Sequence, residues 1–201
     1  MKTTGVVCVC SRGLVHSRTM EGIDKNMSEV SGDWIRIFTH DKPIPEAQNE
    51  IVEEARRHNP KWLWFVEEDV VPPDGVLKKL LGETKEHDVV AAKYKLRGGA
   101  WSHYPRTGPL LFAGLGCLLV HLKVFDRIGY PYFRTDRQFG FALRPAGRQK
   151  QKYGGQDVYF FAMLKKFKIE AKLLDIECQH LYVTKTGDVR NNVGFHSVEA
   201  C

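Results

Sequence analysis

Three consecutive carboxylates follow a run of large apolar residues in the segment LWFVEEDVVPP. Glu67, Glu68 and Asp69 stand between apolar residues 63–66 and a Val-Val-Pro-Pro sequence, so little water is expected around three unpaired charges. Clustered carboxylate oxygens favour a hard divalent cation such as Mg²⁺ or Mn²⁺. Because a strand alternates its faces, we expect Glu67 and Asp69 on one side and Glu68 on the other. An exposed acidic turn is the competing interpretation, and the apolar context favours the metal site.

Two later residues could take part in the same chemistry. Asp157, in the sequence GGQD, opens a predicted helix over residues 156–167. A carboxylate in a first helical turn stabilises the helix dipole, so helix stabilisation and general-base catalysis both explain it. His180 shares a strand face with Cys178, where a single histidine is more often structural. It becomes a candidate third metal ligand if the acids hold a metal.

The elements that must position these residues alternate between apolar runs and helical patterns. Strand, helix and strand in succession indicate a parallel sheet with right-handed crossovers, in which ligands bind at the carboxyl ends of the strands. The acids fall at that edge. The predicted helices cover residues 15–26, 45–58 and 74–81, the last capped by Asp74. The predicted strands cover residues 5–10, 34–39, 62–66 and 88–94.

The second half of the chain is less regular. Residues 110–120 read as one apolar strand interrupted by Gly114 and Gly116, which suggests close approach of another backbone or a ligand. A short helix over 124–128 and a long polar stretch over 130–153 follow. We expect one domain over residues 1–182 and a tail over 183–201 that becomes ordered on ligand binding.

Composition limits the classes of protein. The chain has 201 residues, 43% of them hydrophobic, which supports one well-packed core. A net charge of +6 permits a polyanionic partner, although a merely basic surface explains it equally well. The 5 cysteines include no C-x-x-C pair, which argues against a disulfide framework or a zinc site. No apolar run approaches the ~20 residues of a membrane span, so we expect a soluble, cytoplasmic protein.

The order of these pieces resembles the nucleotide-sugar glycosyltransferases of the A-type fold, in particular the large inverting family that includes cellulose-synthase-like enzymes. That family has an A-R-N segment, a helix, and an apolar strand ending in D-D-D-x-x-x-P. The matching text here is Ala47-Gln48-Asn49, a helix to residue 58, and WLWFV followed by the acids and Pro72-Pro73. The segment AGLGCLLVHLKVFDRIGYPYF resembles the glycine-containing strand and short helix that come next in that family. The sequence GQD at 155–157 resembles the family's G-E-D motif. The similarity spans residues 5–181.

This resemblance implies a single-domain, Rossmann-like α/β fold with a mostly parallel sheet and helices on both faces. It implies that Asp69, assisted by Glu67 and His180, holds Mn²⁺ or Mg²⁺ against the diphosphate of a nucleotide sugar, most simply a UDP-sugar. Asp157 would be the general base of an inverting transfer. Residues implied to contact the donor are Cys10, Ser11, Arg12, Asp41, Glu68, Gly114 and Gly116. The chain departs from the family at Glu67, Gln48 and Gln156, where aspartate, arginine and glutamate are usual.

The acceptor is predicted from charge. Small basic enzymes of this resemblance occur in bacteriophages, where they glycosylate hydroxylated DNA bases, so a hydroxylated base in DNA is one predicted acceptor and the host cytoplasm one predicted location. Glycan, lipid-linked and protein acceptors stay open. Residues expected to contact the acceptor are Gln156, Arg144, Arg148, Lys150 and Lys152.

Three other functions fit parts of the sequence. A nuclease or other two-metal phosphoryl-transfer enzyme would need a further strand-borne acid pair. A sugar-phosphate nucleotidyltransferase would carry a glycine-rich phosphate loop after the first strand, where CSRGLVHSR has one glycine. A non-catalytic nucleic-acid-binding module explains the basic charge and leaves the acids between apolar segments unexplained.

Overall fold

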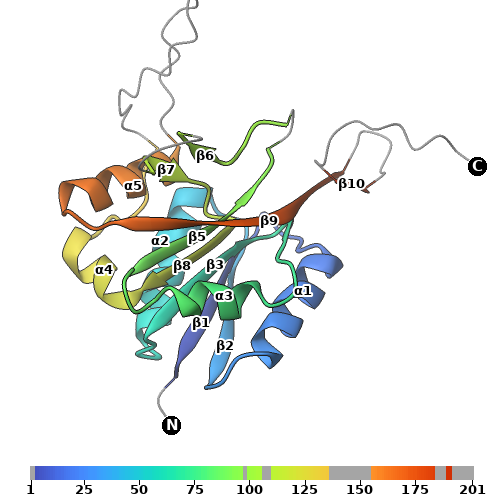
Figure 1. The fold of residues 1–201 in the computed structure, drawn as a ribbon, viewed down its shortest axis with the longest axis horizontal. Coiled ribbons are helices and arrows are strands. Elements are labelled where there is room, and N and C mark those ends of the chain that lie inside the picture. The colour runs from blue at the N-terminus through green and yellow to red at the C-terminus, as the bar shows by residue number, and fades with distance from the viewer. Residues whose placement is uncertain (1–2, 97–98, 106–109, 136–154, 184–188, 192–201) are drawn as a thin grey trace, which may run out of the picture.

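The fold is built around one large sheet in the computed structural model, which describes residues 3–96, 99–105, 110–135, 155–183 and 189–191 (Figure 1). The strands follow the order β10-β9-β5-β8-β3-β1-β2, and β4 pairs with β9 beside this path. Strands β6 and β7 form a separate two-stranded sheet. The strands are β1 (Gly5–Cys10), β2 (Trp34–Thr39), β3 (Trp62–Glu67), β4 (Val70–Val71), β5 (Val89–Tyr94), β6 (His103–Tyr104), β7 (Phe112–Ala113), β8 (Cys117–His121), β9 (Ala171–Val183) and β10 (Val189–Asn191).

The sheet is mostly parallel, as predicted, but β8 lies antiparallel in its interior, and β4 and β10 pair antiparallel with β9. Strands β2, β1 and β3 run parallel to one another, and β5 runs parallel to β9. Strand β8 is inserted between β3 and β5 and is antiparallel to both. The single strand predicted over residues 110–120 is therefore wrong, because the chain turns at Gly114-Leu115-Gly116 and divides it into β7 and β8.

Helices cover both faces of the sheet, as predicted (Figure 1). Successive residues of β1 belong to opposite cores: Cys8 joins one and Val9 the other. Burial on both faces explains why β1 and β3 read as continuous apolar runs. The first core contains α2 (Ile44–Arg56), α4 (Leu122–Ile128) and α5 (Gln156–Lys166), and the second contains α1 (Ser17–Ser28) and α3 (Val76–Gly82). No helix within the described ranges is long and apolar enough to span a membrane.

The start of α3 corrects one prediction. Its N-cap is Gly75, with φ of 69°, and not Asp74, which instead forms an ion pair with Lys25 at the surface. The capping contact comes from the buried side chain of Asn26 on α1. Its Oδ1 accepts the Leu77 N–H at 3.0 Å, and its Nδ2 donates to the Pro73 carbonyl at 2.9 Å. A residue distant in sequence therefore supplies the acceptor that a local cap would provide.

Strand register brings the chemical residues to one edge. Cys10, the last residue of β1, lies beside Glu67, the last residue of β3. Strand β9 is long enough to pass β5 and pair with β4, which places His180 opposite Val70. The loop after β1, the acidic turn after β3 and the second half of β9 therefore meet at the carboxyl ends of the parallel strands.

Candidate functional site

A cleft of about 800 Å³ opens at this edge of the sheet. Its walls come from the loop after β1, the start of α2, the turn after β3, the start of α5 and β9. Segments that are far apart in sequence thus contribute to one concave surface, which is the usual form of a small-molecule site. The sequence-predicted residues among its lining are Cys10, Arg12, Glu67, Glu68, Asp69, Gln156 and His180.

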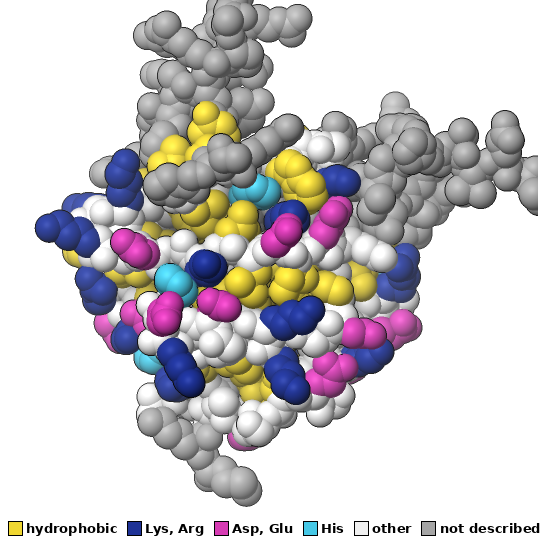
Figure 2. Space-filling model, viewed as in Figure 1, with side chains coloured by type: hydrophobic (Ala, Val, Ile, Leu, Met, Phe, Trp, Pro, Cys, Tyr) yellow, Lys and Arg dark blue, Asp and Glu magenta, His cyan; other side chains and the backbone are white. Residues whose placement is uncertain are grey.

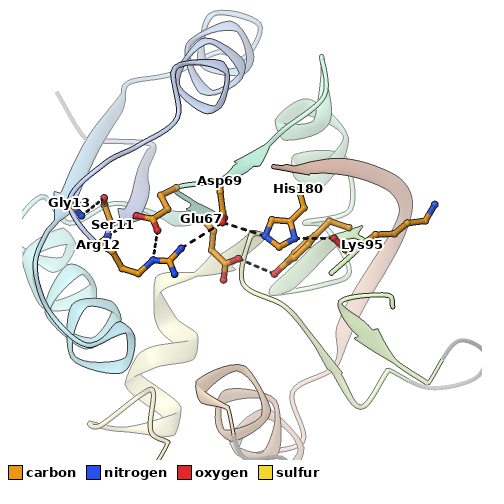
Figure 3. A network of polar contacts seen from close by, with 9 residues as sticks. Ser11, Arg12, Gly13, Glu67, Asp69, Lys95 and His180 are labelled. Carbon is orange, nitrogen blue, oxygen red and sulfur yellow. Dashed lines mark hydrogen bonds and ion pairs between the residues drawn. The ribbon is translucent and has the colours of Figure 1, made fainter. Parts of the chain in front are cut away.

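Arg12 contacts two of the three acids, Glu68 and Asp69, and the third, Glu67, has a different partner (Figure 3). Glu67 ends β3, and Glu68 and Asp69 form the turn before β4. Arg12 occupies both oxygens of Glu68, through its Nε at 2.5 Å and its backbone N–H at 2.6 Å. Glu68 thereby anchors the loop after β1. Because Arg12 already binds both of its carboxylate oxygens, Arg12 competes with the predicted contact between Glu68 and the nucleotide-sugar donor. Asp69 Oδ2 lies 3.4 Å from His180 Nε2 and 3.7 Å from an Arg12 Nη2.

The histidine is oriented as a metal ligand would be. His180 Nδ1 lies 2.9 Å from the Lys95 carbonyl oxygen, which can only accept, so Nδ1 carries a proton. Nε2 then faces Asp69 and, in the neutral ring, presents its lone pair there. Burial opposes the charged ring, but the hydrogen bond and the charge of Asp69 outweigh it and raise the pKa of His180.

Glu67 is an unusual carboxylate because its surroundings disfavour ionisation. Burial, together with the charge of Asp69, raises the pKa of Glu67 to about 7. The Tyr94 hydroxyl donates to Glu67 Oε2 at 3.1 Å. Sequence reasoning missed Tyr94, whose only signal is an aromatic residue at the end of the predicted strand over residues 88–94.

Two glycines predicted to contact the donor are packed against this tyrosine. A Cβ on Gly114 would lie 2.1 Å from the Tyr94 hydroxyl oxygen, and one on Gly116 would lie 2.8 Å from its ring. The predicted close approach therefore involves an aromatic side chain. Contact of Gly114 and Gly116 with a donor stays a prediction.

Asp157 lies in the first turn of α5, next to Gln156 of the cleft lining, and does not itself line the cleft. Gly155 is the N-cap and makes no side-chain capping bond, and Asp157 Oδ1 accepts the Val158 N–H at 2.8 Å. Burial raises the pKa of Asp157. Burial is the main cause of the raised pKa values of Glu67 and Tyr94, and the charge of Asp157 adds to both. The carboxylate supports the first turn of α5, and its role as general base stays a prediction.

The other predicted donor residues divide between the cleft and the loop beside it. Cys10 lines the cleft, and burial raises the pKa of its thiol to about 12, so it is a neutral group there. Ser11 is fully buried, and its Oγ accepts the Gly13 N–H at 3.0 Å. Asp41 lies outside the cleft lining, with φ of 56° and its carboxylate beside Gly13. Ser11 and Asp41 thus contact the Gly13 loop.

The cleft also has apolar walls that sequence reasoning did not single out. Leu14 is 87% exposed, an unusual state for a leucine beside a cavity, and Ile44 lies at the start of α2. Residues that line the cleft without having been predicted are Leu14, Val15, His16, Ile44, Gln48, Leu181 and Tyr182. A hydropathy pattern cannot distinguish the apolar residues among them from core residues.

The predicted acceptor residues Arg144, Arg148, Lys150 and Lys152 lie outside the described residues. On the face drawn in Figure 2, basic side chains are interspersed with acidic ones and do not form one basic patch. Gln156, the remaining predicted acceptor residue, lines the cleft. Contact with DNA stays a prediction.

The candidate metal-ligating side chains suit a cation that is coordinated by the protein and a substrate together. Over the parts of the chain that the structure describes, no three His, Cys, Asp or Glu side chains form a preformed metal cluster. Asp69 and His180 do converge, however, and a hard divalent cation is commonly held by one or two protein carboxylates and completes its shell with waters and substrate phosphates. The residues present therefore fit a metal held jointly with a diphosphate.

Comparison with known proteins places the fold. No protein-family model matches the chain, and no curated protein sequence matches it. Among solved structures, A197 from STIV aligns over 94% of both chains with a TM-score of 0.66 and 17% identity. Glucosyl-3-phosphoglycerate synthase from Mycobacterium tuberculosis, in complex with Mg²⁺ and UDP, aligns over 89% of this chain and 71% of its own with a TM-score of 0.50 and 13% identity.

A weaker likeness, with a TM-score of 0.47 and 10% identity, links 86% of this chain to 82% of a glycosyltransferase involved in glycosylation of the PBCV-1 major capsid. These identities are low, so the likeness concerns the fold and leaves bacteriophage origin and acceptor untested. The chain has the α/β fold of the A-type nucleotide-sugar transferases.

Proposed function

We propose that the protein is a metal-dependent glycosyltransferase that moves a sugar from a nucleotide donor, most simply a UDP-sugar, to an acceptor hydroxyl. The observation that carries the proposal is the pairing of Asp69 with His180, whose Nδ1 proton is committed to the Lys95 carbonyl. This pairing lies in a cleft at the carboxyl edge of the sheet, where ligands bind in open α/β folds.

Asp69 and His180 would hold Mn²⁺ or Mg²⁺, and Glu67 would assist them. The ion supplies positive charge that stabilises the departing nucleoside diphosphate. Arg12 adds a guanidinium beside Asp69, suited to a phosphate oxygen because it offers several donors in a fixed plane. The exposed apolar wall at Leu14 and Ile44 offers a surface for the uncharged part of the donor.

Asp157 is the proposed general base. Its raised pKa favours proton acceptance from a hydroxyl at neutral pH, as an effective base requires. Attack of that hydroxyl on the anomeric carbon, from the face opposite the leaving diphosphate, would invert the configuration of the sugar. Gln156, beside the base and in the cleft lining, is the proposed acceptor contact.

Calorimetry with UDP, in Mn²⁺ and separately in EDTA, tests the metal part of this proposal. We expect Mn²⁺ to tighten UDP binding to the wild type, and Asp69→Asn and His180→Ala to remove most of that gain. His121→Asn is the matched control, because His121 caps α4 at the opposite end of the sheet. UDP binding that is the same in Mn²⁺ and EDTA would exclude a metal-dependent donor site.

Product analysis separates the transfer from its nearest alternative. A glycosyltransferase incubated with UDP-sugars and a hydroxyl acceptor, or with water as a slow substitute, releases UDP. A nucleotidyltransferase incubated with a nucleoside triphosphate and a sugar 1-phosphate releases pyrophosphate. Pyrophosphate release without UDP release would contradict the proposed reaction.

A further inference from the structure

Tyr94 is a buried hydroxyl at the site that the proposed reaction does not use. It ends β5 and is 2% exposed. Its Oη lies 3.1 Å from Glu67 Oε2 and 3.3 Å from the backbone nitrogen of Gly116. The buried hydroxyl therefore joins the acidic edge to the turn before β8.

Tyr94 is the donor in its hydrogen bond to Glu67. Its Oη accepts the Gly116 N–H and donates its own proton to the Glu67 carboxylate, so the hydroxyl takes part in both contacts at once. The Gly116 carbonyl also accepts the Glu67 backbone N–H at 3.4 Å. One glycine thus holds the backbone of Glu67 and orients the donor to its side chain.

The tyrosine ring is held in a closely fitted slot. Any side chain at Gly114 would bring its Cβ within 2.1 Å of the hydroxyl oxygen, and one at Gly116 within 2.8 Å of the ring. The Tyr94 backbone N–H donates to Ser102 Oγ at 3.1 Å. The Tyr94 ring also meets the His180 ring in a T-shaped contact, with centroids 5.3 Å apart and planes at 74°.

We infer that Tyr94 is a positioning residue for the metal site, holding Glu67 by a directed hydrogen bond and His180 by contact with its ring. The inference rests on the proposed metal-dependent function. Tyr94 reaches two of the three proposed ligands, and Lys95, its neighbour in sequence, supplies the carbonyl that orients His180. Residues at the end of β5 therefore support the proposed metal ligands from behind. Residues that contact metal ligands in this way normally set the orientation of the ligands and the affinity for the metal.

Tyr94→Phe tests the inference, because it removes one oxygen and keeps the ring. We expect Mn²⁺ affinity, measured by calorimetry in the presence of UDP, to fall about 10-fold or more, as with other supporting residues of metal sites. Tyr132→Phe is the matched control: Tyr132 is 4% exposed and donates to Glu53 at 2.6 Å, away from the cleft. Its Mn²⁺ affinity should equal that of the wild type. Equal affinities in all three proteins would overturn the inference.

Crystal structures give a second measurement that does not depend on metal affinity. In metal-free Tyr94→Phe, we expect the Glu67 carboxylate to leave its present position and His180 to reorient. In the wild type with UDP and Mg²⁺, we expect the bond between Tyr94 and Glu67 to persist. Unmoved Glu67 and His180 in the variant, or a broken bond in the complex, would overturn the inference. If the wild type shows no metal-dependent UDP binding, the proposed function fails, and these structures alone decide the role of Tyr94.

Discussion

Replacing Glu67 by glutamine should stabilise the metal-free protein, and increasingly so as the pH rises. Burial of Glu67 and the nearby charge of Asp69 raise its pKa from the ordinary 4.5 to about 7. Each pH unit of displacement corresponds to about 1.4 kcal/mol, so ionised Glu67 costs the folded state about 3 kcal/mol. Glutamine keeps an oxygen that can accept the Tyr94 hydroxyl and carries no charge.

The sign of the pH dependence follows from proton binding. Between pH 4.5 and 7 the folded wild type binds more protons at Glu67 than the unfolded chain, so the wild type loses stability as the pH rises. The Glu67→Gln variant has no such loss. The difference in unfolding free energy between variant and wild type should therefore be constant below about pH 4.5, increase by about 3 kcal/mol up to about pH 8, and then level off.

Urea denaturation in EDTA, at several pH values from 4.5 to 8.5, measures this difference directly. Glu21→Gln, which changes an exposed glutamate on α1, reports the effect of the substitution alone. A stability difference for Glu67→Gln that does not change with pH would refute the argument that Glu67 is ionised at a cost. Added Mn²⁺ and UDP should favour the wild type over the variant, because the proposed site needs the carboxylate.

Three further substitutions have distinct expected outcomes. Asp157→Asn should keep UDP affinity and lower turnover by at least ~10²-fold in a transfer assay, whereas a residue that only supports α5 would leave turnover unchanged. Gly116→Ala should lower the free energy of unfolding, measured by urea denaturation, by about 1–3 kcal/mol, because the new Cβ would lie 2.7 Å from a Val70 methyl group. Gly82→Ala is the control and should not lower it, because nothing lies within 4 Å of a Cβ at that position. Asn49→Ala should destabilise the fold by about 3 kcal/mol or more, because three of the side chain's four hydrogen bonds join α2 to the segment after α4, and a loss under 1 kcal/mol would contradict their importance.

Much of the fold was predictable because its elements are encoded locally. Strands β1 and β2 occupy the predicted ranges. Strand β1 is buried on both faces and therefore appears in the sequence as an apolar run with clear ends, whereas β2 is a partly exposed edge strand whose apolar residues are interrupted by Arg36. The positions of the acids, of Asp157 and of His180 relative to those elements were predictable for the same reason. Their association at one edge follows from the general geometry of parallel sheets.

The tertiary structure alone decided which partners these residues have. Glu68 is bound by Arg12, which is 56 positions away, and no local pattern distinguishes it from its neighbours Glu67 and Asp69. The glycines at 114 and 116 gave a correct signal of close approach, but the approaching group, Tyr94, comes from β5. A single sequence shows where side chains can point along a strand. Which distant side chain meets them depends on strand order, and here an antiparallel strand inserted between two parallel ones set that order.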